Sequence, residues 1–348
     1  MKLTEAIKEI QPLDEQAMEQ AYKRWTSIAI PLHSLGKMQD VVIRIAGISR
    51  SNDVRLTKKA LVVMCADNGV VEEGISQSGQ EVTLIISENF LEEKATASIM
   101  CRNAGADIFP IDIGIAVDSR LENRKVMYGT KNMAKEPAMT RDEVIKAIET
   151  GITIVSQLKD RGYRIIATGE MGIGNTASAA LLTHVFTQSP LIDCTGRGTG
   201  LDDAGLLRKR ELLAQAVKRA ELPHDADAVT VLSEFGGFEI AMMAGALLGG
   251  AERGMTLLVD GFVATSALLV ATRIAPAIPE YCIFCHRSAE PGHQAQIHAL
   301  KGEPLLDMGL RLGEGTGALL AYPLICSALD FLNDMASFES AGVSQGVN

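Results

Sequence analysis

One glutamate of this sequence stands between glycines directly before an apolar segment. Residues 311–317 read Arg-Leu-Gly-Glu-Gly-Thr-Gly and lead into the apolar residues 318–329, which predict a helix that begins close to Glu314. Gly313 and Gly315 allow the backbone to approach a ligand closely, and the free N–H groups of a first helical turn attract anions. The segment therefore suits a phosphate or a developing negative charge. The alternative is that Glu314 only complements the helix dipole.

A second glycine-rich segment, residues 169–176, follows a predicted strand and reads Gly-Glu-Met-Gly-Ile-Gly-Asn-Thr. It is suited to cradling a phosphate, and Asn175 and Thr176 are residue types that cap a following helix. A tight turn explains the glycines but not Glu170 at the exit of the strand. The glycine order G-x-x-G-x-G is not the dinucleotide fingerprint, and the chain has no G-x-x-x-x-G-K-S/T string. Neither NAD nor a nucleoside triphosphate is therefore indicated.

Two further loops carry polar groups. Residues 195–203 are rich in glycine and contain Arg197, and the run Arg208-Lys209-Arg210 lies nearby. Flexible backbone and cations suit a phosphate ester, although such a basic run is more often a solvated helix face. Residues 286–293 offer hydroxyl, imidazole and carboxylate groups. We assign neither histidine of this loop as a catalytic base, because the sequence shows no partner for it.

The composition favours a small-molecule partner. The 348 residues carry a formal net charge of −10, which argues against a nucleic acid or an anionic membrane surface. The first eleven residues have no apolar core of signal-peptide length, and the longest apolar runs, such as 317–329, are shorter than a membrane-spanning helix. Six scattered cysteines indicate reduced thiols. We therefore expect a cytoplasmic protein.

The string Cys282-Ile283-Phe284-Cys285-His286 matches the attachment pattern of c-type haem. A short buried strand at this place would put Cys282 and Cys285 on opposite faces. No second cysteine pair completes a tetrahedral metal site. We therefore expect neither a metal nor another cofactor.

The apolar segments predict an α/β fold with a doubly wound, mostly parallel sheet of the Rossmann-like kind. Short apolar strands alternate with longer helical stretches, as in sheets whose two faces are covered by helices. The predicted strands are 61–66, 108–113, 164–168, 255–259 and 281–285. The predicted helices are 87–103, 141–159, 176–187, 206–220, 238–253 and 264–275, with one or two more within 3–25. Ligands of such sheets bind beyond the carboxyl ends of the strands, so the glycine-rich loops are expected to converge on one crevice.

Several loops, in this order, resemble the nicotinate-nucleotide:dimethylbenzimidazole phosphoribosyltransferase family of cobamide biosynthesis. They are residues 169–176, Ser-Glu-Phe-Gly-Gly-Phe-Glu at 233–239, Asp-Gly-Phe at 260–262 and residues 311–317, with shorter matches at 34–36, 64–67 and 288–290. The similarity covers nearly the whole chain. It implies a dimer, with a small helical domain built from residues 1–35 and 331–348 beside a large α/β catalytic domain of residues 36–330.

The resemblance also implies a reaction. Phosphoribose would pass from nicotinate mononucleotide to an aromatic lower-ligand base, which gives an α-ribotide and releases nicotinate without a metal. Glu314 occupies the position of the family's general base, and Glu170 matches a second glutamate that stabilises positive charge on the ribose. The other positions implied to bind substrate are Ser78, Ile86, Gly172, Gly174, Asn175, Lys209, Ser288, Gly313 and Gly315.

The sequence departs from the family pattern around the acceptor. Residues 31–36 read Pro-Leu-His-Ser-Leu-Gly where the family usually has Pro-Pro-Gly-Ser-Leu-Gly, and Gly79 replaces a common proline next to Ser78. Ile86 stands where benzimidazole-using members can carry a glutamine. Loss of an amide makes a pocket less suited to a second ring nitrogen. The acceptor candidates are therefore dimethylbenzimidazole and a phenolic compound such as phenol or p-cresol.

The phenol-using branch of this family pairs two related subunits, so the partner in the dimer is either a second copy or a related chain. Three alternatives remain open. A related phosphoribosyltransferase with a purine or benzimidazole acceptor differs only in the pocket. A non-catalytic subunit that supports an active partner is disfavoured because both Glu170 and Glu314 are present. A dehydrogenase on a doubly wound sheet lacks the required glycine order.

Overall fold

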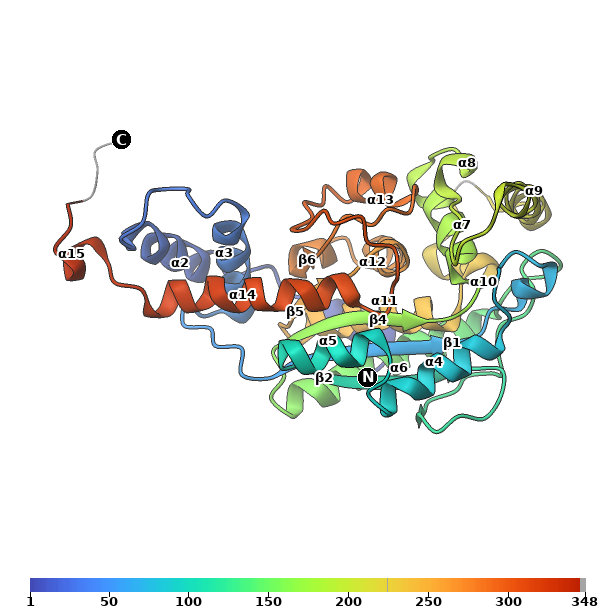
Figure 1. Cartoon of the computed structure of the whole chain (residues 1–348), viewed down its shortest axis with the longest axis horizontal. Coiled ribbons are helices and arrows are strands. Elements are labelled where there is room, and N and C mark those ends of the chain that lie inside the picture. The colour runs from blue at the N-terminus through green and yellow to red at the C-terminus, as the bar shows by residue number, and fades with distance from the viewer. Residues whose placement is uncertain (224, 345–348) are drawn as a thin grey trace.

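Six parallel strands form one sheet in the middle of the structure (Figure 1). The computed structural model describes residues 1–223 and 225–344. Within them the strand order is β3-β2-β1-β4-β5-β6, and every neighbouring pair is parallel. The strands are β1 Lys59–Ala66, β2 Asp107–Gly114, β3 Glu122–Asn123, β4 Ile165–Met171, β5 Thr256–Val259 and β6 Cys282–Phe284. The predicted α/β class with a doubly wound parallel sheet is confirmed.

All five predicted strands are present, because each is a short apolar run that the sheet buries. β1 shows how both faces are used. Leu61 and Val63 belong to one hydrophobic cluster, and Val62 and Met64 belong to the cluster on the other face. The sequence did not predict β3, since its two residues are exposed and carry no apolar pattern.

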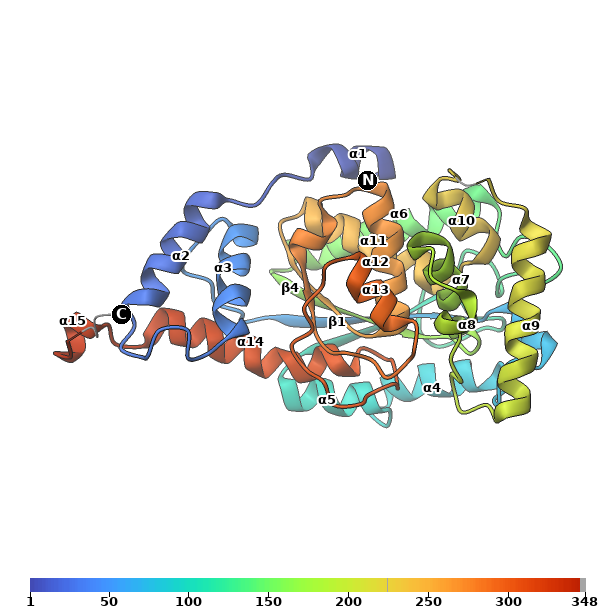
Figure 2. The ribbon, with the colours of Figure 1, turned by 90° about the horizontal axis from the view of Figure 1, so that it is seen from above.

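Helices cover both faces of the sheet (Figure 2). One face is covered by α6, α7, α10, α11 and α12, and the other by α2, α3, α4, α5 and α14. The helices are α1 Leu3–Glu9, α2 Glu15–Ser27, α3 Lys37–Ser49, α4 Glu81–Leu91, α5 Thr96–Ala104, α6 Arg141–Asp160, α7 Asn175–Thr187, α8 Leu191–Cys194, α9 Asp203–Ala220, α10 Ala228–Phe235, α11 Phe238–Glu252, α12 Phe262–Ile274, α13 His293–Ala299, α14 Thr316–Asp334 and α15 Phe338–Ala341.

Two predictions about helix extent were wrong. The predicted helix 87–103 is divided between α4 and α5, because the chain turns at Glu93, whose φ of 54° is left-handed. The apolar run 317–329 lies within α14, whose 19 residues are long and apolar enough to cross a membrane by length and composition. However, 56% of its most apolar window is buried in the structure, as in a core helix of a globular protein.

The segment after α2 pairs with the segment after α14, whereas the N-terminus itself lies apart from α15 (Figure 1). Ala29 donates its backbone N–H to the carbonyl of Ala336 at 3.0 Å. α2 packs on α3 and α14, whereas α1 packs on α6 and α11. The division into 1–35 with 331–348 and 36–330 stays a prediction. Its last four residues lie outside the described part of the chain.

α6 and α11 cross at very short range because glycines face each other there. A methyl group on Gly245 would lie 2.0 Å from the carbonyl oxygen of Ile148, and one on Gly151 would lie 2.0 Å from that of Met242. Backbone atoms cannot move aside as a side chain can. This contact holds α11 directly against the sheet. All residues of α11 from Phe238 to Ala251 are buried.

We expect Gly245→Ala to lower the free energy of unfolding by about 1–3 kcal/mol, because the added methyl group must push the two helices apart. Denaturant unfolding followed by circular dichroism measures this. Lys146→Ala, on the exposed side of α6, is the control and should change the free energy by less than about 0.5 kcal/mol. Equal stability of the two variants would show that the crossing tolerates a wider separation.

Candidate active site

One pocket opens at the carboxyl ends of the strands, where the loops after β4, β5 and β6 meet the turn before α14. Ten of the eleven predicted site residues line it: Ser78, Ile86, Glu170, Gly172, Gly174, Asn175, Lys209, Ser288, Gly313 and Glu314. Gly315 is not among the lining residues. A methyl group there would lie 2.4 Å from Leu61 Cδ1, so Gly315 packs against the sheet instead.

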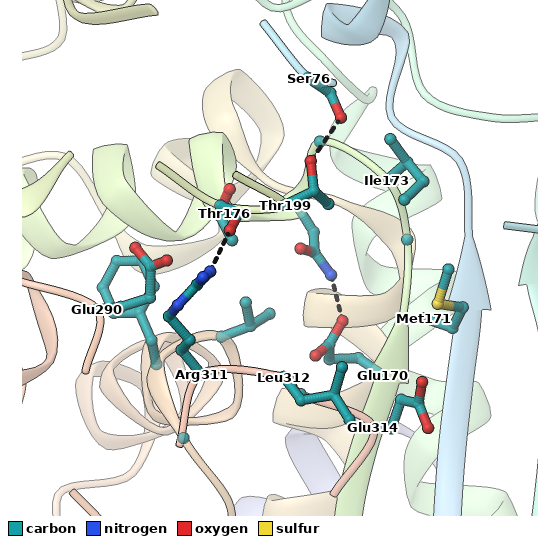
Figure 3. A pocket seen from close by; sticks show the side chains of 18 of the residues that line it. Ser76, Glu170, Met171, Ile173, Thr176, Thr199, Glu290, Arg311, Leu312 and Glu314 are labelled. Carbon is teal, nitrogen blue, oxygen red and sulfur yellow. Dashed lines mark hydrogen bonds between the residues drawn. The ribbon is translucent and has the colours of Figure 1, made fainter. Parts of the chain in front are cut away.

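Glu170 is a buried carboxylate at the end of β4, only 8% exposed. The amide of Asn175 donates a hydrogen bond to its Oε2 (Figure 3). Burial raises the pKa of Glu170 to about 8, and the nearby carboxylates of Glu239, Asp260 and Glu314 raise it further while Asn175 opposes the shift. Glu170 is therefore largely protonated at neutral pH in the free protein. A positive charge in the pocket would favour its ionised form.

The prediction that Asn175 and Thr176 cap α7 was wrong in detail. Gly174 is the N-cap, with a φ of 91°, and Asn175 is the first helical residue. The amide of Asn175 is used to hold Glu170 instead of the helix end. The first turn of α7 and the loop from Gly172 to Gly174 still face the pocket, as an anion cradle requires.

Glu314 lies on the turn before α14 and is also 8% exposed. Its Oε2 accepts a hydrogen bond of 3.1 Å from the backbone N–H of Ala97 in the first turn of α5. Burial raises the pKa of Glu314 above its ordinary value, the N–H of Ala97 lowers it, and the charge of Asp260 raises it. A carboxylate with a raised pKa is a stronger base.

Close packing joins the two glutamates. A methyl group on Gly313 would lie 2.4 Å from Glu170 Oε1, and one on Gly169 would lie 2.6 Å from the carbonyl oxygen of Glu314. Gly313 also has a left-handed φ of 94°. The glycines that the sequence places around the two carboxylates therefore let the turn before α14 lie directly on the end of β4.

Cations occupy another part of the pocket. Lys209 is 1% exposed, and its Nζ donates to Thr176 Oγ1 at 2.8 Å. Burial lowers the pKa of Lys209 to about 8, although the carboxylate of Glu290 opposes this. Arg311 also lines the pocket and donates to the carbonyl of Gly198 at 3.1 Å. Two cations near a helix start suit a phosphate group.

Another part of the wall is largely aliphatic, with Ser76 and Ser78 beside it. Figure 3 shows Met171 and Leu312 beside Glu170 and Glu314, and Ile173 further along the pocket near Thr199. Ile75, Val82 and Ile86 continue this wall from the segment before and within α4. Such a wall suits an aromatic ring.

Two histidines that the sequence left without roles have partners in the structure. His286 Nε2 lies 3.5 Å from Asp260 Oδ1, and both side chains are buried. His293 accepts the backbone N–H of Ser288 at 2.8 Å and contacts Thr265 Oγ1 at 3.0 Å. Burial lowers the pKa of His293 to about 3, so it is neutral and fixes the loop of Ser288. The sequence analysis placed Asp260 in the Asp-Gly-Phe loop after a strand but gave it no role.

The described residues contain no group of three or more His, Cys, Asp or Glu side chains placed to hold a metal ion. Cys282 and Cys285 belong to hydrophobic clusters on opposite faces of the sheet, as the short strand predicted. All six cysteines are free thiols.

A doubly wound sheet with an anion-binding loop and buried carboxylates at its strand ends defines an enzyme that acts on a phosphorylated small molecule. A family model described as a phosphoribosyltransferase matches residues 10–343. The chain belongs to this family and is therefore a pentosyl-transferring enzyme.

Relatives and solved structures agree with the family over nearly the full length. The chain is 49% identical over 335 residues, 95% of each chain, to the nicotinate-nucleotide–dimethylbenzimidazole phosphoribosyltransferase of Dechloromonas aromatica. It is 44% identical to the enzyme of the same name from Chloroflexus aggregans, over 99% of this chain and 98% of that one. The crystal structure of CobT from Thermus thermophilus aligns with a TM-score of 0.90 and 39% identity, over 95% of this chain and 100% of that one.

We expect Gly313→Ala to reduce phosphoribosyl transfer by about 100-fold, because its methyl group would displace Glu170 and strain the turn that carries Glu314. Steady-state kinetics measures the loss. Gly309→Ala is the matched control: Gly309 also has a left-handed φ, of 68°, but its added methyl group would meet nothing within 4 Å. If both variants lose activity equally, backbone strain is the cause and contact with Glu170 is not.

Proposed function

We propose that this chain transfers phosphoribose from nicotinate mononucleotide to an aromatic lower-ligand base. The product is an α-ribotide for the nucleotide loop of a cobamide, and nicotinate is released. The observation that carries the proposal is the convergence of Glu170 and Glu314, both buried, with the loop from Gly172 to Gly174 on one pocket. The names of the relatives support the same donor.

Glu314 acts as the general base in this proposal. Its carboxylate takes the proton from the acceptor as an acceptor atom bonds to the anomeric carbon, and the bond from that carbon to the pyridinium nitrogen breaks. The electron pair of the broken bond neutralises the ring, which leaves as nicotinate. Attack on the face opposite the leaving group converts the β-nucleotide to the α-product. The raised pKa of Glu314 supports its role as a base.

Glu170 stabilises the positive charge of the donor. The pyridinium ring and the ribose in the transition state are both cationic, and each favours an ionised carboxylate beside it. Gly172, Gly174 and Lys209 bind the phosphate in this proposal, with Ser288 nearby. The buried Lys209 supports this, since an anion beside its ammonium would offset the cost of its burial.

Within this proposal, the aliphatic side chains of the wall favour a phenolic acceptor over a benzimidazole. Ile86, Val82 and Ile173 offer no partner for a second ring nitrogen, whereas a phenol needs only a base for its single O–H. The relatives from Dechloromonas and Chloroflexus are named for dimethylbenzimidazole, so both kinds of acceptor must be assayed side by side. We also propose that the enzyme is cytoplasmic and works as a dimer, either with itself or with a related subunit.

The alternative is a fold-retaining subunit that supports an active partner. The two buried glutamates of the pocket argue against it, because burying carboxylates is costly and a support role does not need them. If the purified chain neither binds nicotinate mononucleotide nor releases nicotinate with any acceptor, this alternative is correct.

An acceptor panel tests the function. Purified protein is incubated with nicotinate mononucleotide and phenol, p-cresol, dimethylbenzimidazole or adenine, and products are identified by mass spectrometry. We expect α-ribotides, with higher kcat/KM for the phenols than for dimethylbenzimidazole. Glu314→Gln should lose at least about 100-fold in kcat, the size of a general-base contribution.

Glu303→Gln, at an exposed position outside the pocket, is the control for the loss of one carboxylate and should match the wild type. Retained turnover in Glu314→Gln would remove this residue from the mechanism. A preference for dimethylbenzimidazole would reject the phenolic acceptor and leave the transfer reaction in place.

The pH dependence of donor binding tests Glu170. Because burial raises the pKa of Glu170 to about 8 in the free protein, binding of a cationic ring must expel a proton at lower pH. Affinity for nicotinate mononucleotide should therefore rise by up to about tenfold per pH unit towards pH 8, and it should fall at higher pH as Lys209 loses its charge. Calorimetry in buffers of different ionisation enthalpy measures both affinity and proton release.

Glu170→Gln is the control, since its amide does not titrate. Lys209, whose pKa is lowered to about 8 by burial, loses charge over the same range in both proteins, so the difference between the two profiles isolates Glu170. Identical profiles would mean that Glu170 keeps its protonation state when the donor binds.

A further inference from the structure

The turn that carries Glu314 has an unusual backbone. Gly313, Glu314 and Gly315 have consecutive left-handed φ values of 94°, 59° and 82°. The left-handed region is unfavourable for a residue with a side chain, and such residues persist only where their surroundings fix them. Gly315 is the N-cap of α14 and offers no side chain to hold the helix end. Another part of the molecule must therefore hold this turn.

Asp260 fills this role from the end of β5. Its Oδ1 accepts a hydrogen bond of 3.0 Å from the backbone N–H of Ala318, and the N–H groups of Gly315 and Gly317 also point to its carboxylate. These are the first N–H groups of α14, which have no partners within the helix. Asp260 thus caps α14 from 58 residues away in the sequence.

His286 holds Asp260 from the other side. Its Nε2 lies 3.5 Å from Asp260 Oδ1, and its ring occupies space that two glycines leave open. A methyl group on Gly317 would lie 1.9 Å from His286 Cδ2, and one on Gly261 would lie 2.8 Å from Nε2. The histidine is therefore packed against the same helix start that Asp260 caps.

We propose that Asp260, held by His286, is a positioning residue for the base Glu314: it fixes the turn of Glu314 by capping α14 and strengthens the base by its negative charge. The inference rests on the proposed function. Asp260 also lines the pocket, but the role proposed for it is exerted through Glu314. The observation behind this inference is that the carboxylate of Asp260 lies beside three backbone N–H groups at the start of α14.

The groups that face Glu314 set the expected effect on pH dependence. They are the carboxylate of Glu170 at the end of β4, the carboxylate of Asp260 after β5, and the N–H of Ala97 at the start of α5. His286 lies next to Asp260, with 3.5 Å between His286 Nε2 and Asp260 Oδ1. Among these, Asp260 raises the pKa of Glu314 and Ala97 lowers it. Removing the charge of Asp260 should therefore lower the pKa of Glu314.

The test compares the pH profiles of kcat at saturating nicotinate mononucleotide for wild type and Asp260→Asn with the best acceptor of the panel, because the acid limb of kcat/KM also reports Glu170, whose pKa Asp260 raises as well. Asparagine keeps the shape and an acceptor oxygen but loses the charge. We expect kcat to fall by about 10- to 100-fold, the KM for nicotinate mononucleotide to stay within about threefold, and the acid limb to move to lower pH by about one unit. Loss of a residue that only supports the fold would lower activity without shifting the acid limb of the pH profile.

Asp227→Asn is the matched control, because Asp227 caps α10 through the N–H groups of Val229 and Thr230 outside the pocket. It should leave kcat and the limb unchanged. His286→Gln provides a second test if Asp260→Asn does not fold. Burial raises the pKa of Asp260 and the charge of His286 opposes this, so loss of His286 should favour neutral Asp260 and move the limb in the same direction.

The two proposals fail in different ways. An active wild type beside an Asp260→Asn variant with unchanged kcat and unchanged acid limb overturns the positioning role and leaves the transfer reaction intact. An unchanged acid limb in the pH profile of His286→Gln would also overturn the positioning role. A wild type that forms no product with any acceptor overturns the proposed function and the positioning role together.

Discussion

The pocket depends on one kind of interaction: its buried carboxylates accept hydrogen bonds from groups at the starts of helices. Glu170 is held by an amide from α7, Glu314 by an N–H of α5, and Asp260 by the start of α14. A carboxylate removed from water without such partners is strongly destabilised. The doubly wound fold supplies them because each of these helices starts at the carboxyl edge of the sheet, where its free N–H groups point to the crevice.

The same constraint explains why the turn before α14 lies so close to the sheet. Glu314 receives the N–H of Ala97 only if its backbone is seated against the end of β4, and Gly169 and Gly313 permit this approach. Any side chain at either position would separate the two carboxylates. The glycines therefore set the distance between charged groups, and the raised pKa values of Glu170 and Glu314 are a consequence of that packing.

The sequence predicted the sheet and most of its helices because apolar periodicity reports burial, and it predicted the pocket because glycine-rich loops follow the strands. It could not predict the long-range partners. Nothing near Asp260 in the chain indicates that it caps a helix that begins 56 residues later at Thr316. Asn175 was assigned to a helix cap because local rules favour it there, but in the structure its amide holds Glu170. Tertiary contacts decided both cases.

The distribution of charge in the pocket restricts the ligand that it can accept. Glu170 and Glu314 lie near Met171 and Leu312, whereas Lys209 and Arg311, with the carboxylate of Glu290 beside them, lie towards α9 and the loop of Gly198. A ligand with uniform charge would be repelled by one end. The proposed donor has a positive pyridinium nitrogen and an anionic phosphate, and once the nitrogen becomes neutral the released nicotinate keeps only the negative charge of its own carboxylate. In the proposed reaction, this arrangement would favour departure of the ring.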